Sequence, residues 1–129
     1  MRVSERDYTN LTSGTKGKKP AGPKETEIQN AMRDYLRMFG WFVIRHQQGL
    51  GCHKGLSDLT AIKDGWTVYV EAKTGKGTLS DDQKEFRDDI IASGGTYVIG
   101  RCIEDVAFLC QDNVELLRIR WCGKCVGRE

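Results

Sequence analysis

Two carboxylates and a lysine stand where the sequence predicts a β-hairpin. Asp58 begins one short strand, and Glu71 and Lys73 lie together in the apolar strand that follows it. Because side chains alternate along a strand, Glu71 and Lys73 share one face. Two interpretations are open: exposed cross-strand ion pairs, or a site for a hard ion such as Mg²⁺, which binds one or two carboxylates and keeps waters for a phosphate. In a metal site, a neighbouring lysine can orient a water or stabilise charge on the phosphate.

The strands that carry these residues are predicted from short-range signals. Residues 58–62 and 66–73 are predicted to be strands, and the Asp-Gly pair between them favours a tight hairpin turn. Another strand is predicted over residues 41–45, and a strand over residues 96–100 follows later in the chain. Asp58 therefore lies at the start of one strand, near the end at which its partner strand finishes.

The predicted helices would flank this sheet. Residues 23–40 are predicted to form a helix, because their apolar residues recur at helical spacing and form one stripe. Pro23 suits the start of the helix and Gly40 its end. The stripe consists of Ile28, Ala31, Met32, Tyr35, Leu36 and Phe39. Ser80 and Gln83 fit a capping box for a second helix over residues 81–93. A third helix is expected over residues 104–118.

The order α-β-β-β-α-β-α predicts an α/β protein with a small mixed sheet flanked by helices. At 129 residues the chain has room for one domain. We expect a flexible arm over residues 1–23, a folded domain over residues 24–121 and a C-terminal tail over residues 122–129. No apolar run approaches the roughly 18 residues of a membrane span, and no signal-peptide pattern is present, so the expected location is the cytoplasm.

Basic residues are concentrated near the start of the chain. Residues 1–24 contain six basic and two acidic side chains, a net charge of +4, whereas the whole chain has a net charge of +2. Such an arm suits a polyanionic partner, which Lys16, Lys18 and Lys19 would contact. The alternative is a solvated, disordered tail.

A glycine-rich loop over residues 47–57 offers a second possible contact with a phosphate. Its glycines would let the backbone approach closely, and His53 and Lys54 would supply cationic or hydrogen-bonding groups.

The five cysteines have no disulfide-framework spacing and are expected to be free thiols. Cys122 and Cys125 form half of a zinc site, and a closed site needs four ligands. A zinc-dependent interaction protein is therefore an alternative, although free thiols on a frayed tail are favoured. His46 is interpreted as a structural histidine, since no nucleophile accompanies it.

Several segments, taken in order, resemble the virus-type replication-repair nuclease (VRR-NUC) domain of the PD-(D/E)xK nuclease superfamily. They are a helix opening with ETEIQ, a strand ending in an arginine, KGLSDL, YVEAKTGKGTLSDDQ and GGTYVIG, and they span about residues 24–103. The resemblance implies a restriction-endonuclease-like core and makes residues 24–121 a nuclease domain. Ser57 departs from the pattern, because the superfamily usually has proline there.

The resemblance also implies a role for each site residue. Asp58 and Glu71 would bind Mg²⁺ or Mn²⁺, with the backbone carbonyl of Ala72 as a third ligand. Lys73 would position and polarise the attacking water.

Two further residues match positions on the family's helices. Glu25 matches the helix glutamate and lies on the Ile28 stripe, while Glu27 at the edge of the stripe is the weaker match. Gln83 matches the family's glutamine after the third strand, and its capping role is an equally good explanation; one side chain could serve both.

The resemblance thus implies a metal-dependent DNA endonuclease that hydrolyses phosphodiester bonds without a covalent intermediate. Stand-alone domains of this family resemble Holliday junction resolvases, which implies a homodimer, branched or nicked DNA as substrate, and a role in DNA repair or recombination. A phage origin, and hence the host cytoplasm, is implied likewise. A nucleic-acid-binding module of the same fold without catalysis is the alternative.

A dimer would need an apolar surface, and the C-terminal segment offers one. Its stripe consists of Val106, Leu109, Cys110, Val114 and Leu117, with Ile119 and Trp121 just beyond. The sequence leaves open whether this stripe forms a dimer interface or covers the sheet of its own chain.

Overall fold

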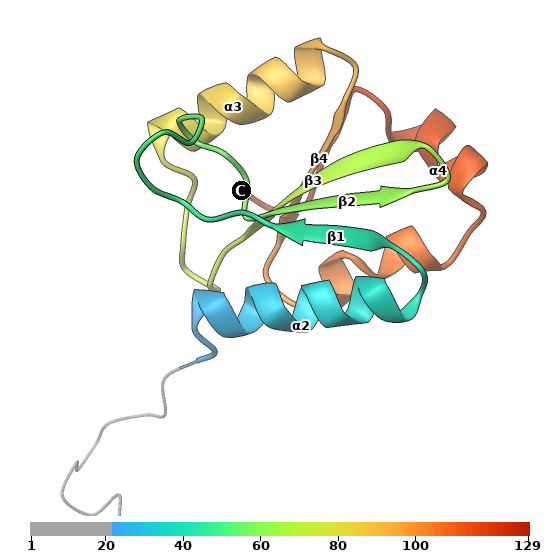
Figure 1. Ribbon diagram of the computed structural model, residues 1–129, viewed down its shortest axis with the longest axis horizontal. Coiled ribbons are helices and arrows are strands. Elements are labelled where there is room, and N and C mark those ends of the chain that lie inside the picture. Colours follow the sequence, from blue (N-terminus) through green and yellow to red (C-terminus); the bar gives the residue numbers. More distant parts are fainter. Residues whose placement is uncertain (1–21) are drawn as a thin grey trace, which may run out of the picture.

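A five-stranded mixed sheet lies between helices in the structure, a computed structural model that describes residues 22–129 (Figure 1). The helices are α2 (Glu25–Met38), α3 (Asp81–Ala92) and α4 (Val114–Trp121), with short 3₁₀ turns η1 (Ile103–Asp105) and η2 (Ala107–Cys110). The strands are β1 (Phe42–Arg45), β2 (Leu59–Lys63), β3 (Trp66–Ala72), β4 (Thr96–Gly100) and β5 (Cys125–Val126). The predicted α/β class, with a small mixed sheet flanked by helices, is confirmed. Lys16, Lys18 and Lys19 of the predicted arm lie outside the described residues.

The strands are ordered β1-β2-β3-β4-β5 across the sheet. The pairs β1–β2 and β2–β3 are antiparallel, whereas β3–β4 and β4–β5 are parallel. The β2–β3 hairpin turns through Asp64 and Gly65, both at positive φ, as the Asp-Gly signal predicted. Helix α3 provides the crossover between β3 and β4 that two parallel strands require.

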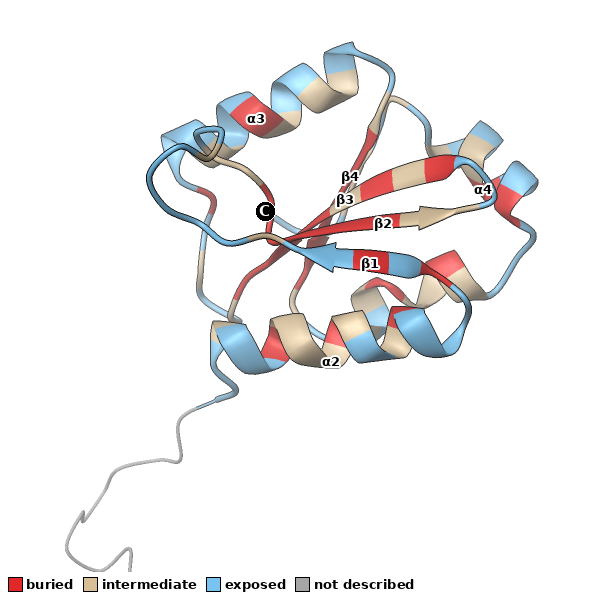
Figure 2. Ribbon diagram, viewed as in Figure 1, coloured by how far each residue is buried: buried red, intermediate tan, exposed pale blue. Residues whose placement is uncertain are grey.

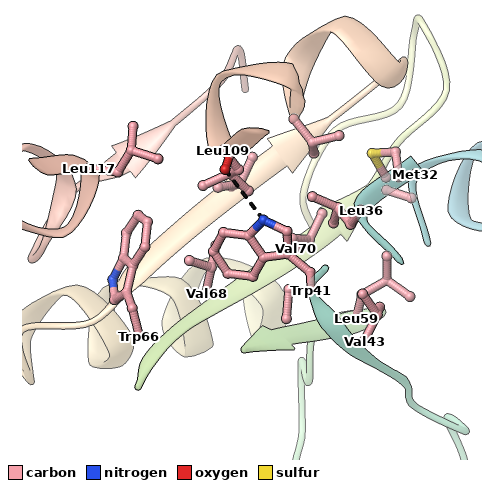
Figure 3. Close-up of a cluster of buried hydrophobic side chains, with 14 of the residues drawn as sticks. Met32, Leu36, Trp41, Val43, Leu59, Trp66, Val68, Val70, Leu109 and Leu117 are labelled. Atoms are coloured by element: carbon pink, nitrogen blue, oxygen red, sulfur yellow. Dashed lines mark hydrogen bonds between the residues drawn. The ribbon is translucent and has the colours of Figure 1, made fainter. Parts of the chain in front are cut away.

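One face of the sheet packs against α2 and the 3₁₀ turns. Alternate residues of β3, namely Trp66, Val68, Val70 and Ala72, point to this face and are buried together with Met32 and Leu36 of α2. Figure 3 shows this cluster, in which the indole N–H of Trp41 donates to the carbonyl of Leu109 at 3.3 Å. Gly100 allows α2 to lie close to β4, because a Cβ there would stand 2.3 Å from the Met32 sulfur.

Helix α3 covers the opposite face of the sheet (Figure 1). Phe86 is buried on Tyr97 and contacts Tyr69 edge to face, with ring centroids 5.8 Å apart. Leu79 and Ile99 complete this smaller cluster. The burial pattern in Figure 2 follows these two layers, with buried residues along the strands and on the sheet-facing sides of α2 and α3. Both faces of β3 and β4 are therefore covered, which fixes the register of the sheet.

The prediction of one helix over residues 104–118 is wrong. The chain forms η1 and η2 instead, and α4 begins after Asn113, whose side chain accepts from the backbone N–H groups of Glu115 and Leu116. Asp105 is also used locally, because its carboxylate accepts from the backbone N–H of Arg101. A stronger capping site at Asn113 and these short turns replace a continuous helix.

The apolar stripe of this segment covers the sheet of its own chain. Val106, Leu109, Val114 and Leu117 are all buried in the α2-side core. Ile119 remains 69% exposed. The stripe is therefore used within the chain and is not available as a dimer interface.

The expectation of a frayed end is wrong for residues 125 and 126. Cys125 and Val126 form β5, whose partners on β4 are Tyr97 and Val98. The Arg101 guanidinium bonds the carbonyl of Arg128 and thereby holds the chain beyond β5. Within residues 22–129, no helix has the length and apolar character needed to cross a membrane.

Candidate metal centre

Asp58 lies where β2 and β3 separate, immediately before β2 begins. Its backbone carbonyl accepts from the His46 N–H at 2.9 Å, which continues the pairing of β2 with β1. Its carboxylate turns the other way and accepts from the backbone N–H of Ala72 at 2.8 Å. The side chain is thus held at the end of β3 by a charge-assisted hydrogen bond.

Ser57, at the position where proline is usual in the superfamily, also shapes this entry to β2. Its side chain is completely buried, and its hydroxyl donates to the carbonyl of Leu59 at 3.1 Å. This local side-chain-to-backbone bond fixes the turn before Asp58 without a proline ring.

Three carboxylates meet at this end of the sheet. One ligand oxygen from each of Glu25, Asp58 and Glu71 lies within 4.8 Å of the other two. Ligands on opposite sides of a hard divalent ion, each about 2.1–2.5 Å from it, are about 4–5 Å apart. The spacing of the three oxygens therefore fits one shared ion.

The two oxygens of Glu71 have different surroundings. Oε2 accepts from the Gln83 side chain at 3.2 Å and lies 3.7 Å from the Lys73 ammonium. Oε1 is buried and has no hydrogen-bond partner within residues 22–129. A buried oxygen without a partner loses its hydration with no compensation, so a cation at Oε1 would satisfy an otherwise costly group.

Burial and neighbouring charge disfavour the charged forms of two of these groups, Glu71 and Glu25. Burial first, and then the neighbouring Asp58, raise the pKa of Glu71 to about 9, although Lys73 opposes the shift. Burial is also the main cause that raises the pKa of Glu25, with Lys73 again opposing it. A divalent cation would oppose both shifts, because its charge favours the ionised forms of the carboxyl groups around it.

Gln83 caps α3, as its spacing from Ser80 predicted, and it also contacts the carboxylate cluster; a role in catalysis stays a prediction. Its side-chain oxygen accepts from the Ser80 backbone N–H at 2.9 Å, which completes the capping box of α3. Its side-chain nitrogen donates to Glu71. The start of α3 is therefore tied directly to the carboxylate cluster.

Glu25 and Glu27 have different environments in the structure. Glu25 is partly buried and belongs to the carboxylate cluster. Glu27 is exposed and lines a mainly apolar cavity of about 360 Å³ beside Ile28 and Arg101. Geometry thus favours Glu25 as the helix carboxylate.

His53 and Lys54 lie in a loop that packs on α3. The imidazole of His53 meets the Phe86 ring edge to face at 5.4 Å, and the two residues line a cavity of about 330 Å³ with Asp82, Glu85 and Asp89. Gly55 permits the close packing, because a Cβ there would stand 2.0 Å from the carbonyl oxygen of Asp82. A phosphate at this cavity would face three carboxylates, and contact of His53 and Lys54 with DNA stays a prediction. The role of the Ala72 carbonyl as a ligand also stays a prediction.

The cysteines do not join a metal cluster in the described part of the chain. All five are free, and the one group of three or more potential metal ligands found within residues 22–129 is the Glu25, Asp58 and Glu71 set. Cys122 is exposed, and Cys125 lies in β5.

A polar groove beside Asp58 was not foreseen from the sequence. It encloses about 590 Å³ and is lined by residues of α2 and of the end of β1, including Gln29 and Arg45. The alternation of β1 could have indicated it, since Arg45 is two residues after the buried Val43 and so points to the α2 side.

Comparison with known proteins supports the fold. No family model matches the sequence, and no curated protein matches it significantly. A solved structure described as a VRR_NUC domain superposes with a TM-score of 0.57 at 17% identity, covering 68% of this chain and 95% of that one. The resemblance stated from the sequence, with its restriction-endonuclease-like core, is thereby confirmed as a likeness of fold.

Proposed function

We propose that this chain, with its VRR_NUC-like fold, is a nuclease that hydrolyses DNA phosphodiester bonds and depends on Mg²⁺ or Mn²⁺. The carrying observation is the convergence of Glu25, Asp58 and Glu71 at one end of the sheet, with a buried Glu71 oxygen that lacks a partner among the described residues. Hard divalent ions prefer such carboxylate oxygens and retain waters that phosphate can displace. A binding module without catalysis would not need this arrangement of repelling charges.

Each residue of the site has a distinct task in this proposal. Glu25, Asp58 and Glu71 would hold the ion, with the carbonyl of Ala72 beside them. When bound, the ion would supply Lewis-acid activation and neutralise charge on the scissile phosphate.

Two side chains prepare the site. Lys73, close to Glu71, is placed to orient a water and to stabilise the charge that develops on the phosphate during in-line attack. Gln83 donates to Oε2 of Glu71 and would thereby orient the carboxylate so that Oε1 could bind the ion.

Isosteric substitution of the carboxylates tests the proposal. Asp58→Asn and Glu71→Gln should each reduce cleavage of supercoiled plasmid at least about 100-fold with Mg²⁺ or Mn²⁺, because metal catalysis contributes several kcal/mol. Asp64→Asn is the matched control, since Asp64 is exposed in the hairpin turn, where its positive φ also suits asparagine. Agarose gels with and without chelator provide the measurement.

Two results would contradict the proposal. One is near-normal cutting by both site variants. The other is DNA that is retarded but uncut by the unaltered protein with either metal, which would instead indicate a binding module.

We further propose that branched or nicked DNA is cut in preference to plain duplex, by a homodimer. Support for this part comes from the sequence resemblance, since a junction has two strands to be cut about a two-fold axis. A panel of labelled duplex, nicked, flapped and four-way DNAs, with light scattering for mass, tests it. Paired symmetric incisions by a dimer are expected; a monomer that nicks all of these DNAs alike would contradict this preference and leave a general nuclease.

A further inference from the structure

The groove next to the carboxylate cluster has two walls from different parts of the chain. Thr26 and Gln29 of α2 form one wall, and Arg45 and Gln47, at the end of β1 and just beyond it, form the other. Asp58 belongs both to the groove and to the cluster. The groove of about 590 Å³ therefore adjoins the proposed metal centre at Asp58.

Some of the polar groups along this groove are already used by the fold. His46 shares a hydrogen bond of 2.6 Å with the Thr60 hydroxyl, which agrees with a structural role. The side chain of Gln48 donates to the carbonyl of Leu56 at 2.8 Å and so closes the base of the following loop. Contacts with a ligand would therefore come from the other wall residues. These offer the hydroxyl of Thr26, the amides of Gln29 and Gln47 and the guanidinium of Arg45.

Arg45 is held across the groove. Like the buried Val43 two residues earlier, it projects to the α2 side of the sheet, where its guanidinium donates to the Asn30 side chain at 3.2 Å. A guanidinium has five N–H donors, so this single bond orients the group and leaves donors for an anion. Planar guanidinium groups bind phosphate through two parallel hydrogen bonds.

The groove and the two polar side chains Lys73 and Gln83 meet the cluster at different residues. Lys73 and Gln83 both contact Glu71, whereas the groove meets the cluster at Asp58. A phosphodiester strand whose scissile phosphate lies at the cluster would extend into the groove. One arginine among neutral amides suits one phosphate flanked by the hydrogen-bonding groups of a nucleotide.

We propose that this groove positions the substrate strand beside the scissile phosphate. Arg45 binds the neighbouring phosphate, and Gln29 and Gln47 hydrogen-bond the sugar or base edges of the same nucleotide. The inference rests on the proposed nuclease function, and it assigns to that site a subsite formed by α2 and the end of β1.

The test measures binding of a fluorescent oligonucleotide by anisotropy, using the full chain with Glu71→Gln to prevent cutting. In this background Arg45→Ala should weaken binding about tenfold, because hydrogen bonds to charged groups contribute more than neutral ones. The slope of log K against log salt concentration should also shrink in magnitude by about 0.7–0.9. Arg45→Lys should keep the slope but recover only part of the affinity, since lysine lacks the planar fork.

Arg120→Ala is the matched control. Arg120 is an exposed arginine of α4, stacked on Trp121, and is not part of the groove. It should change neither affinity nor slope. Gln29→Ala should weaken binding while leaving the salt slope unchanged, because it removes no charge.

Two outcomes would overturn the subsite. The first is unchanged affinity and salt slope in Arg45→Ala. The second is an equal loss of affinity in Arg120→Ala, which would indicate that any positive charge on the surface contributes to binding. Cleavage assays without the Glu71 substitution separate this failure from failure of the function: normal cutting and KM in Arg45→Ala remove the subsite but leave the nuclease. Conversely, an unaltered protein that never cuts, with binding still dependent on Arg45, removes the nuclease and retains a nucleic-acid-binding groove.

Discussion

Glu71 is completely buried on β3, yet in the part of the chain that the structure describes one of its oxygens has no hydrogen-bond partner. Burial and the nearby Asp58 raise its pKa to about 9 from an ordinary value of 4.5. In the metal-free protein, the folded state therefore holds a proton that the unfolded chain releases as pH rises above 4.5. Its contribution to the free energy of unfolding is fully present below 4.5 and is lost as pH rises through about 9.

This linkage predicts that metal-free protein loses stability between about pH 5 and about pH 9, and that Glu71→Gln removes most of that loss. Urea denaturation in chelator across this range provides the measurement. Glu85→Gln on the exposed face of α3 is the control and should keep the slope of the unaltered protein. Parallel pH profiles for the unaltered protein and Glu71→Gln would contradict the prediction.

Two glutamates in the first turn of α2 have different environments, and they predict different effects on cleavage. Glu25→Gln should reduce the cleavage rate roughly 10–100-fold, because Glu25 contributes an oxygen to the metal cluster. Glu27→Gln should stay within about twofold, as is usual for an exposed residue away from the site. Plasmid cleavage at equal protein and metal concentrations compares them. The reverse order would place the other face of α2 at the site.

Helix α3 connects its own start to the carboxylate cluster. The capping box needs the Ser80 hydroxyl and the Gln83 side-chain oxygen, whereas the bond to Glu71 needs the Gln83 side-chain nitrogen. Substitutions at the start of α3 can therefore change the stability of the helix without changing the contact with Glu71, or change that contact without removing the cap.

Three substitutions test that separation. Ser80→Ala should lower the free energy of unfolding by about 1 kcal/mol and leave cleavage nearly unchanged. Gln83→Glu keeps an acceptor for the cap but replaces the donor to Glu71 with another carboxylate, so cleavage should fall while the cap remains. Gln83→Ala should impair both. Urea denaturation and plasmid cleavage measure the two effects, and full activity in Gln83→Glu would contradict a role for this amide at the site.

At the scale of the whole molecule, we expect the basic residues that precede the described part of the chain to contribute measurably to DNA affinity. Removing residues 1–21 deletes Lys16, Lys18 and Lys19. Each lost phosphate contact should reduce the magnitude of the log–log salt slope for duplex DNA by about 0.9. Anisotropy titrations of both proteins at several salt concentrations measure the change. An unchanged slope would mean that these lysines do not contact DNA. The salt dependence would then have to come from basic residues of the described part, such as Arg45.

Local patterns in the sequence predicted the main elements and brought Asp58, Glu71 and Lys73 to one end of the hairpin, whereas site roles for Glu25 and Gln83 were implied by the family resemblance. The apolar stripe predicted α2, the Asp-Gly pair predicted the β2–β3 hairpin, and Ser80 with Gln83 predicted the start of α3. These elements can be predicted from the sequence because each depends on residues that are close together in the chain. Since the hairpin fixes its own register, the proximity of Asp58 to Glu71 followed from it.

Contacts between distant segments decided the rest. The C-terminal stripe has helical spacing, but packing of Val106 and Leu109 against the sheet and capping by Asn113 divide it into short turns and α4. Strand β5 exists because β4 offers a free edge to Cys125. The groove arises where Arg45 meets α2, an encounter between segments that no local pattern encodes. Hydrogen bonds and burial across the fold, rather than local propensity, set these features, and they also leave a single oxygen of Glu71 without a protein partner.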